Sequence, residues 1–471
     1  MFDTPETELR QTFDAMKSAF AAEPRRSYEQ RMDDLDRLAK AILAHKDEIV
    51  ATVSEDFNGR SVAETILAEV GFVLTDIRHT RGQLKKWMKP KKVAVGLTTA
   101  PGKAYIRYEP LGVAGIVAPW NYPVQLALAP LVAALAAGCR AMIKPSEATP
   151  GSSALLEKMI AATFAPNHVA VVTGGRETGE AFTSLPFDRL FFTGSTHVGR
   201  LVAQAAAKNL TPVTLELGGK SPAVLGDDMP VEKQAEIVGF GKMFNAGQTC
   251  IAPDYVLAPE GRAKPFAEAV MRWVGATYGE TSTSEDYTGQ ITGQHFDRMS
   301  AMVEEAWDRG AEVLQSSTDL QKAKETRKFP LTIVIDPPAD TRMMQEEIFG
   351  PILPILTYRS LDDAVRIIND GERPLALYAV FKEKQKAREV LEKTISGGAG
   401  VNATLIHLSV AELPFGGVGH SGIGAYHGHR GFLEFTHQRS VFEAPSWHPH
   451  TKLVPPFGKL FEFVAKQATR Y

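Results

Sequence analysis

Cysteine, the side chain best suited to nucleophilic catalysis, occurs only twice in the 471 residues. Cys139 lies in "ALAAGCRAM" among small apolar residues, and this setting favours a buried, structural thiol. Cys250 lies in "NAGQTC", whose small and polar residues favour an open loop, and Pro253 stops a helix from continuing beyond it. A free thiol is mostly protonated at neutral pH, so a catalytic Cys250 needs a base or a positive field from elsewhere in the chain. Taken alone, the segment is as compatible with packing as with chemistry.

The elements that must position such a residue alternate in type along the chain. Between residues 105 and 225, short β-branched segments such as "GVAGIVAP", "AMIKPS" and "DRLFFTG" alternate with helical ones. This rhythm predicts a doubly wound parallel sheet, whose ligands bind at the carboxyl ends of the strands. The residues that follow these segments are therefore candidates to line a site: Trp120, Asn121, Lys144, Glu147 and Ser195.

One glycine-containing segment has the context of a phosphate site. "FFTGSTHVG", residues 191–199, follows a predicted strand and opens a predicted helix, so its backbone N–H groups and the helix dipole are oriented toward a phosphate. "GVGHSG" at 417–422 and "GAGVNA" at 398–403 match the dinucleotide-binding fingerprint, but neither lies between a strand and a helix. "LGGKS" resembles the end of a P-loop, but Thr214 occupies the position of the first glycine.

The rest of the chain divides into a helical opening and a second α/β region. Residues 4–90 show apolar spacings of three and four, with Ser27 as a candidate N-cap. From 222 to 408, helices and strands alternate again. The elements expected there include helices at 231–245 and 296–309 and strands at 331–335 and 352–357. The predicted fold class is α/β, with a doubly wound parallel-sheet domain and a second α/β domain.

Composition excludes several classes of function. A net charge of −3 creates no strong field for nucleic acid or an anionic membrane. The twelve histidines form no cluster with metal-ligand spacing, so no metal site is expected. No apolar segment reaches the length of a membrane span, and the acidic start "MFDTPETELR" lacks the features of a signal peptide. With two cysteines that we expect to be free thiols, these features favour a cytoplasmic protein.

The amphipathic tail "KLFEFVAKQATRY" has two interpretations. We expect it to pack on its own chain or on a neighbouring subunit, and binding to a membrane surface is the alternative.

Six segments occur in the order found in aldehyde dehydrogenases: "APWNYP", "IKPSE", "FTGSTHVG", "LELGGKSP", "GQTCIAPDYV" and "EEIFGPILPI". The chain resembles that superfamily over nearly its full length. The segments "LPFGGVGHSGIGAYHG" and "FLEFTHQRSV" resemble the class 3 branch, and within it the bacterial coniferyl aldehyde dehydrogenases. The resemblance implies a cofactor domain at 1–90 and 108–218, a catalytic domain at 219–408, and an oligomerisation arm with a C-terminal tail at 91–107 and 425–471.

The resemblance also implies catalytic roles. Cys250 matches the nucleophile, Glu216 the general base, and Asn121 the side chain that forms an oxyanion hole with the Cys250 backbone N–H. Each role is chemically reasonable, since an aldehyde cannot lose hydride until a thiolate has added to its carbonyl, and the resulting thioester needs a base for hydrolysis. From its own sequence context, Glu216 would instead be a solvated or helix-capping glutamate.

For the cofactor, the resemblance implies NAD, with NADP possible. Lys144 and Glu147 would bind the adenosine ribose, where a carboxylate repels a 2'-phosphate and favours NAD, although a surface ion pair is the usual alternative. The resemblance further assigns Gly194, Ser195 and Gly199 to the pyrophosphate, and Glu347 and Phe349 to the nicotinamide ribose and ring. Trp120 would lie at the channel near the cofactor or substrate, with core packing as the alternative.

The predicted function is therefore NAD(P)-dependent oxidation of an aldehyde, aromatic like coniferaldehyde or medium-chain, to its acid by a homodimer. We expect the substrate tunnel near Tyr122, Phe244, Thr249, Ile251 and the segment 402–413. Two alternatives stay open at this point. A CoA-acylating dehydrogenase would need no base at position 216, and a silent scaffold would retain the fold without activity.

Overall fold

The computed structural model describes residues 3–96, 99–447, 451 and 453–469. The apolar segments of the first predicted domain form a six-stranded sheet in the order β15-β7-β6-β3-β4-β5, in which only the β15–β7 pair is antiparallel. Its strands are β3 (Val113–Val117), β4 (Arg140–Lys144), β5 (Val169–Val171), β6 (Arg189–Thr193), β7 (Val213–Glu216) and β15 (Gly422–Ile423). We call this sheet and its helices the first lobe.

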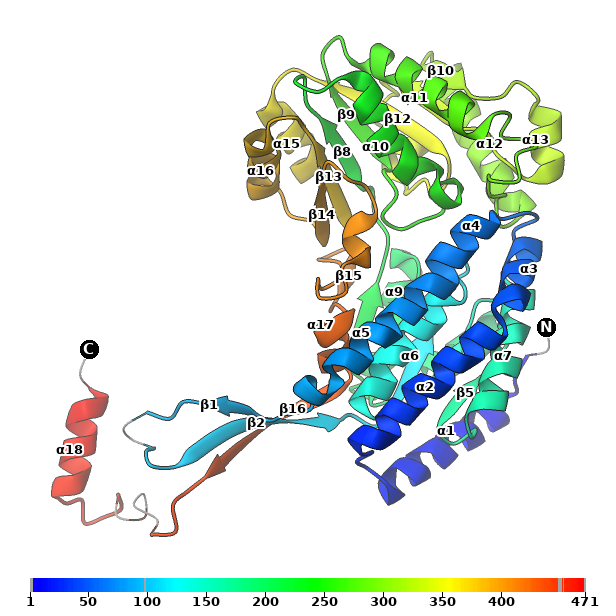
Figure 1. Cartoon of the computed structure of the whole chain (residues 1–471). Coiled ribbons are helices and arrows are strands. Elements are labelled where there is room, and N and C mark those ends of the chain that lie inside the picture. Colours follow the sequence, from blue (N-terminus) through cyan, green and yellow to red (C-terminus); the bar gives the residue numbers. More distant parts are fainter. Residues whose placement is uncertain (1–2, 97–98, 448–450, 452, 470–471) are drawn as a thin grey trace.

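Helices cover both faces of the first sheet, as expected for a doubly wound fold (Figure 1). The helices between its strands are α6 (Gln125–Ala137), α7 (Pro150–Thr163), α8 (Arg176–Thr183) and α9 (Thr196–Ala207). Every residue of α6 is buried, which explains why this helix is apolar on all sides.

The opening segment is helical, as predicted. It consists of α1 (Glu6–Ala22), α2 (Tyr28–Ala44), α3 (Lys46–Asp56), α4 (Val62–Thr65), the π-helix η1 (Ile66–Gly71) and α5 (Phe72–Trp87). Ser27 caps α2 in a capping box, with its side chain accepting from the N–H of Gln30. Helices α2 and α5 contact α6, so the opening segment completes the first lobe.

The second lobe contains a seven-stranded sheet in the order β10-β11-β12-β9-β8-β13-β14, parallel except for β10. Its strands are β8 (Pro222–Leu225), β9 (Tyr255–Pro259), β10 (Glu312–Gln315), β11 (Thr332–Ile335), β12 (Ile352–Tyr358), β13 (Ala376–Val380) and β14 (Gly398–Val401). Its helices are α10 (Val231–Met243), η2 (Phe244–Gly247), α11 (Ala263–Tyr278), α12 (Gly293–Asp308), α13 (Leu320–Thr326), α14 (Arg342–Gln345), α15 (Leu361–Asp370), α16 (Lys384–Lys393) and η3 (Ile406–Ser409).

Two helices of the second lobe differ from the predicted ranges. Helix α10 ends at Met243 rather than 245, because Asn245 and Ala246 adopt left-handed backbone conformations. Helix α12 begins at Gly293 rather than 296, because the Thr292 side chain caps it by accepting from the N–H of His295 at 3.2 Å. The α/β fold class itself is confirmed.

After η3 the chain returns to the first lobe. Strand β15 pairs with β7, and α17 (Gly428–Glu434) contacts α5 and α6. Tyr426, Phe432 and Phe435 are buried in the core of the first lobe.

A three-stranded antiparallel sheet projects from the body (Figure 1). Its strands are β1 (Lys91–Val93), β2 (Lys103–Pro110) and β16 (Thr436–Glu443), and we call it the arm. Helix α18 (Lys459–Ala468) lies beyond the arm, away from both lobes, and none of its residues is buried. Among the described residues, no helix has the length and apolar character needed to cross a membrane.

Candidate active site

A cavity of about 260 Å³ lies between the two lobes, at the carboxyl ends of β3, β6 and β7. It brings together most of the predicted site residues. Its lining consists of Pro119, Trp120, Asn121, Leu126, Thr193, Gly194, Ser195, Glu216, Leu217, Gly218, Cys250, His295, Arg298, Glu347 and Phe349. We call it the first cavity. Of the predicted set, Lys144, Glu147 and Gly199 do not line it.

A strained turn holds Cys250 at this cavity. Asn245, Ala246 and Gly247 have φ values of 52°, 50° and 72°, a left-handed conformation that non-glycine residues rarely adopt. Gly247 is required there for a second reason, since an added Cβ would lie 2.4 Å from the backbone oxygen of Gly350. The turn therefore persists only because its surroundings determine its shape.

The side-chain amides of this region fix the backbone around Cys250. Asn121 Nδ2 donates to the backbone oxygen of Gln248 at 3.1 Å. Asn245 Nδ2 donates to the backbone oxygens of both Asn121 and Gln248, also at 3.1 Å. Since a primary amide carries two N–H groups, the bond from Asn121 to Gln248 leaves it a second donor.

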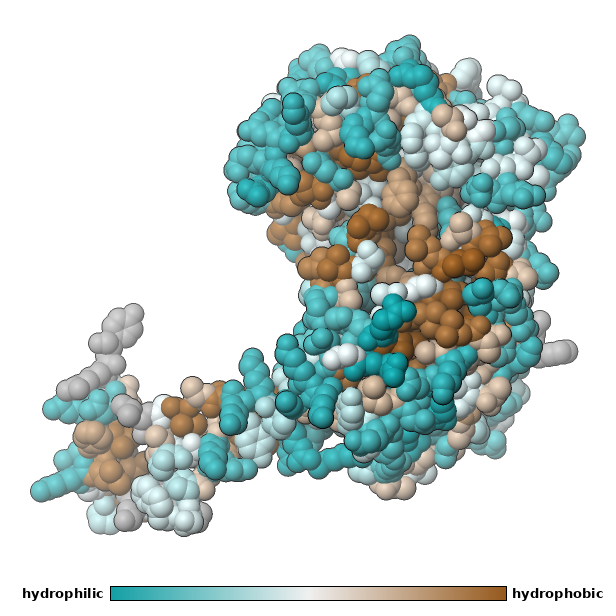
Figure 2. Space-filling model, viewed as in Figure 1, coloured by the Kyte–Doolittle hydropathy of each residue, from teal (hydrophilic) through white to brown (hydrophobic). Residues whose placement is uncertain are grey.

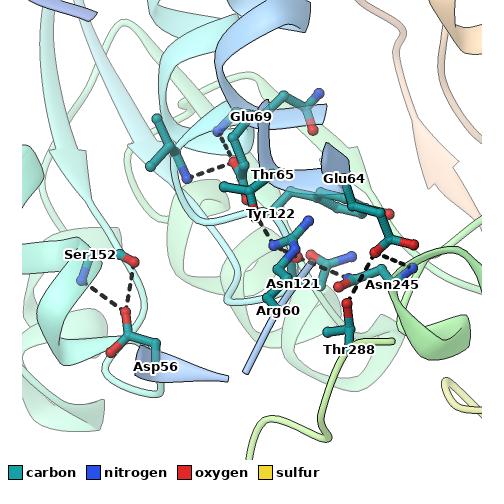
Figure 3. Close-up of polar contacts among 12 residues, drawn as sticks. Asp56, Arg60, Glu64, Thr65, Glu69, Asn121, Tyr122, Ser152, Asn245 and Thr288 are labelled. Carbon is teal, nitrogen blue, oxygen red and sulfur yellow. Dashed lines mark hydrogen bonds and ion pairs between the residues drawn. The ribbon is translucent and has the colours of Figure 1, made fainter. Parts of the chain in front are cut away.

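A buried ion pair supports Asn121 from behind (Figure 3). Arg60 Nη1 donates to Glu69 at 3.0 Å, with both side chains fully buried, and also to the backbone oxygen of Asn121 at 3.1 Å. The other carboxylate oxygen of Glu69 accepts from the N–H groups of Val124 at 3.1 Å and Gln125 at 2.7 Å. Glu69 therefore satisfies backbone donors at the start of α6, just after Asn121 in the chain.

Glu64 supports the strained turn in the same way (Figure 3). Its Oε2 accepts from the N–H of Asn245 and from the hydroxyl of Thr288, each at 3.0 Å. Burial raises the pKa of Glu64 to about 7. Glu64 and Glu69 flank the junction of α4 with the π-helix η1, a helix type often found at functional sites. Sequence reasoning missed both residues.

The pKa values of three ionisable groups at the cavity, Cys250, Glu216 and Glu347, are all raised. Burial raises the pKa of Cys250, and the nearby carboxylates of Glu347 and Glu216 raise it further. Burial also raises the pKa of Glu216 well above its usual range, and neither carboxylate oxygen has a hydrogen-bond partner among the described residues. The pKa of Glu347 is raised to about 8 by burial and by Asp254. A polar molecule that binds in the cavity would supply the hydrogen bonds that the Glu216 carboxyl group lacks.

The segment after β6 forms one wall of the first cavity. Ser195 caps α9 by accepting from the N–H of Val198 at 3.4 Å, and the N–H of Gly194 donates to the backbone oxygen of Glu216 at 3.0 Å. Gly199 lies one turn into α9, where an added Cβ would approach Leu217 Cδ2 to 2.6 Å. Gly199 therefore allows close packing of α9 on the chain that follows β7.

Lys144 is the last residue of β4, and Glu147 follows just beyond the end of the strand. Lys144 Nζ donates to Glu147 Oε2 at 2.9 Å, and the Lys144 side chain is almost fully buried while that of Glu147 is 55% exposed. A carboxylate that is held by a buried ammonium group and open to solvent on its other side can accept hydrogen bonds from a ligand.

Helix α12 contributes two cavity residues that sequence reasoning missed, His295 and Arg298. The His295 ring lies 5.1 Å from the Trp120 ring in an edge-on contact. Arg298 donates to the backbone oxygens of Glu347 at 2.7 Å and Ile348 at 2.8 Å, just before Phe349, which has a φ of 53°. Their spacing of three residues is common on any amphipathic helix, so it could not have singled them out.

A second, mainly apolar cavity of about 370 Å³ lies on the other side of the strained turn at residues 245–247. Neighbouring residues face the two cavities: Asn121 and Cys250 line the first, while Tyr122 and Thr249 line the second and hydrogen-bond each other at 2.6 Å. Phe244 and residues of the segment 402–413 also line it, as expected for the substrate tunnel. Ile251 is instead fully buried in the core of the second lobe.

Cys139, the other cysteine, lines neither cavity. Cys139 is buried and its Sγ donates to the backbone oxygen of Phe435 at 3.3 Å. Within the described ranges, no group of three or more His, Cys, Asp or Glu side chains could hold a metal ion.

Comparison with known proteins identifies the class to which this fold and site belong. The family model for the aldehyde dehydrogenase family matches residues 3–441, and the chain belongs to that family. It is therefore an NAD(P)-dependent oxidoreductase that acts on the aldehyde group. The silent-scaffold and CoA-acylating alternatives are not favoured.

Comparison with individual relatives shows which members of the family the chain is similar to. The chain is 43% identical over 452 residues to a probable coniferyl aldehyde dehydrogenase of Pseudomonas aeruginosa, covering 96% of this chain and 94% of that one. It is 38% identical over 456 residues, 96% of this chain and 92% of the other, to aldehyde dehydrogenase family 3 member H1 of Arabidopsis thaliana. The solved substrate-bound state of Staphylococcus aureus AldH superimposes with a TM-score of 0.93 at 37% identity, covering 98% of this chain and 99% of that chain.

Proposed function

We propose that Cys250 is the nucleophile of an aldehyde oxidation and that Glu216 is its general base. The observation that carries the proposal is the first cavity, which both residues line together with Asn121. The Cys250 thiol must lose its proton to water before the thiolate can add to the carbonyl carbon. Glu216 is the carboxyl group at this cavity that has no hydrogen-bond partner among the described residues, so it is free to act on water in the later hydrolysis.

Addition of the thiolate gives a thiohemiacetal whose oxygen carries a negative charge. The free N–H of Asn121 and the backbone N–H of Cys250 donate to this oxygen. A donor of this kind contributes roughly 3 kcal/mol to stabilisation of the transition state. Because Arg60 and Asn245 both donate to the backbone oxygen of Asn121, its amide is held in place before the substrate binds.

The residues present fit a dinucleotide cofactor. The buried Lys144 and solvent-facing Glu147 suit ribose hydroxyls, the N-terminus of α9 after Gly194 and Ser195 suits the pyrophosphate, and Glu347 suits the second ribose. When bound, NAD or NADP accepts the hydride from the thiohemiacetal carbon. Trp120 and Phe349, whose rings lie 5.3 Å apart edge to face, form an aromatic wall of this cavity.

Loss of hydride leaves a thioester on Cys250. Glu216 then removes a proton from a water molecule, which attacks the thioester carbonyl, releases the carboxylic acid and returns the thiol. A CoA-acylating enzyme would not require this carboxyl group beside the nucleophile.

Three finer features belong to the proposal. The Glu147 carboxylate repels a 2'-phosphate, which favours NAD over NADP. The substrate is an aromatic or medium-chain aldehyde; the name of the Pseudomonas aeruginosa relative and the mainly apolar second cavity support coniferaldehyde. The working form is a homodimer in the cytoplasm, supported by the projecting arm and by two cysteines that are both free thiols.

The test compares three variants by NADH absorbance with coniferaldehyde. Cys250→Ser should lose turnover while still binding NAD in calorimetry. Cys139→Ser should retain turnover. Glu216→Gln should give a rapid first release of NADH followed by slow steady turnover, because the thioester forms but is not hydrolysed. Full turnover by Cys250→Ser would assign the nucleophile elsewhere, and steady turnover by Glu216→Gln at the wild-type rate would remove Glu216 as the base.

A further inference from the structure

The second cavity contains a histidine that no protein group satisfies. His427 is 5% exposed and lines this cavity just before α17. Neither of its ring nitrogens has a hydrogen-bond partner among the described residues. Its ring instead stacks on Phe415 at 5.2 Å and lies 5.4 Å from Phe72. A phenyl ring would suit these neighbours equally well, so packing alone does not explain a histidine at this position.

The chemistry of His427 suits a neutral hydroxyl partner. Burial lowers the pKa of His427 to about 3, so the ring is uncharged and offers one N–H donor and one nitrogen acceptor. Buried polar atoms without partners are rare in folded proteins, because they have given up water without compensation. A hydroxyl group both donates and accepts, and can therefore pair with either nitrogen.

Asp76, on α5, places a second polar group on the same cavity. Its side chain hydrogen-bonds Thr80, and burial raises the pKa of the carboxyl group to about 7. The rest of the lining is mainly apolar, including Leu67, Phe240 and Leu408. Figure 2 shows brown, apolar side chains gathered between the two lobes over this region. Two polar groups in such a setting select for polar atoms at particular positions of a ligand.

We infer that His427 is a specificity-determining residue that binds a hydroxyl group on the part of the substrate remote from the aldehyde, with Asp76 as the neighbouring polar group. The preferred substrates are hydroxylated aromatic aldehydes. The inference rests on the proposed function, in which the aldehyde carbon reaches Cys250 past Thr249. The second cavity then holds the ring and its hydroxyl group.

The test uses two aldehydes that differ by one hydroxyl group, 4-hydroxycinnamaldehyde and cinnamaldehyde. Wild-type kcat/KM should favour the hydroxylated compound by on the order of tenfold or more, because the analogue leaves His427 unpaired. His427→Phe should bring this ratio close to one, because kcat/KM for the hydroxylated compound should fall by more than kcat/KM for cinnamaldehyde. His427→Asn is the second variant, since asparagine tolerates the φ of 73° at this position better than phenylalanine does.

His407→Phe is the matched control. His407 also has two unpartnered ring nitrogens and a stacked contact with Phe415, but it does not line the cavity. The ratio should therefore be unchanged in this variant. A wild-type ratio near one, or a ratio that survives both substitutions of His427, would overturn the inference.

Binding measurements separate this inference from the proposed function. In Cys250→Ser protein with NAD present, calorimetry should show tighter binding of 4-hydroxycinnamaldehyde than of cinnamaldehyde, and the difference should disappear when His427→Asn is added. If the hydroxyl preference is present but Cys250 proves not to be the nucleophile, the catalytic assignment fails and the role of His427 stands. If the preference is absent while Cys250 is the nucleophile, only the role of His427 is lost.

Discussion

Glu64 is a buried carboxyl group that contacts the strained turn at residues 245–247. It accepts hydrogen bonds from Asn245 and Thr288 while burial raises its pKa to about 7. The folded chain therefore retains a proton that the unfolded chain releases. The free energy of unfolding should fall as the pH rises from the unfolded pKa of 4.5 to the folded value of about 7.

Two substitutions of Glu64 separate its charge from its hydrogen bonds. Glu64→Gln keeps an oxygen acceptor and cannot ionise, so its melting temperature should fall less than that of the wild type between about pH 5 and pH 8. Glu64→Ala leaves the Asn245 N–H unpaired and should lose about 1–3 kcal/mol of stability together with kcat. Calorimetric melting curves measure the stability of both variants, and NADH release measures their kcat. Equal stability of the two variants would show that the hydrogen bonds to Glu64 do not matter.

Residues at strand ends could be predicted from the sequence, whereas residues held by tertiary contacts could not. Asn121 and Ser195 follow predicted strands of a parallel sheet, so topology alone places them at one edge. Cys250 and Glu216 needed the family resemblance, because a lone thiol or carboxyl group has no pattern. Arg298 acts through the backbone oxygens of residues 347 and 348, a contact that no local spacing encodes.

At the scale of elements, the turn η2 converts the end of α10 into a support for Cys250. Gly247→Ala should destabilise the protein by about 1–3 kcal/mol and reduce kcat, because the new Cβ would contact the Gly350 oxygen 2.4 Å away in a left-handed conformation. Ala246→Gly is the opposite case, since it relieves a φ of 50° and should stabilise by about 0.5–1 kcal/mol. Thermal unfolding of both variants checks the signs. Unchanged stability in Gly247→Ala would mean that the turn is not strained.

The π-helix η1 shows why element boundaries are harder to predict than element types. The apolar spacing of residues 62–87 indicates helix throughout, and the structure is helical throughout. The widened turn at Ile66–Gly71 leaves that pattern intact. Within it, Glu69 accepts from the distant N–H groups of Val124 and Gln125, contacts that are not visible in local periodicity.

At the scale of the whole molecule, the arm projects away from both lobes (Figure 1). Strand β16 pairs with β2 over residues 436–443 and 103–110, while the outer edge of β16 has no strand partner among the described residues. An unpaired edge is suited to pairing with another chain. The proposed homodimer uses this edge.

A proline in β16 tests the dimer. Gln438→Pro removes a backbone donor from an exposed position of the strand and should shift the mass measured by light scattering toward that of a monomer. Deletion of residues 459–471, which removes α18, measures separately whether the exposed tail contributes to the contact. A wild-type monomer, or a Gln438→Pro dimer of unchanged mass, would exclude the arm as the contact.

The return of the chain to the first lobe has a consequence for biosynthesis. The sheet that contains β7 gains β15 only once residue 423 has been made, and α6 gains its neighbour α17 only at residue 434. The lobe that leaves the ribosome first is thus completed last, after the entire second lobe has been translated. Until then the apolar surface of α6 under α17 has no cover from its own chain, a condition that favours aggregation of incomplete chains.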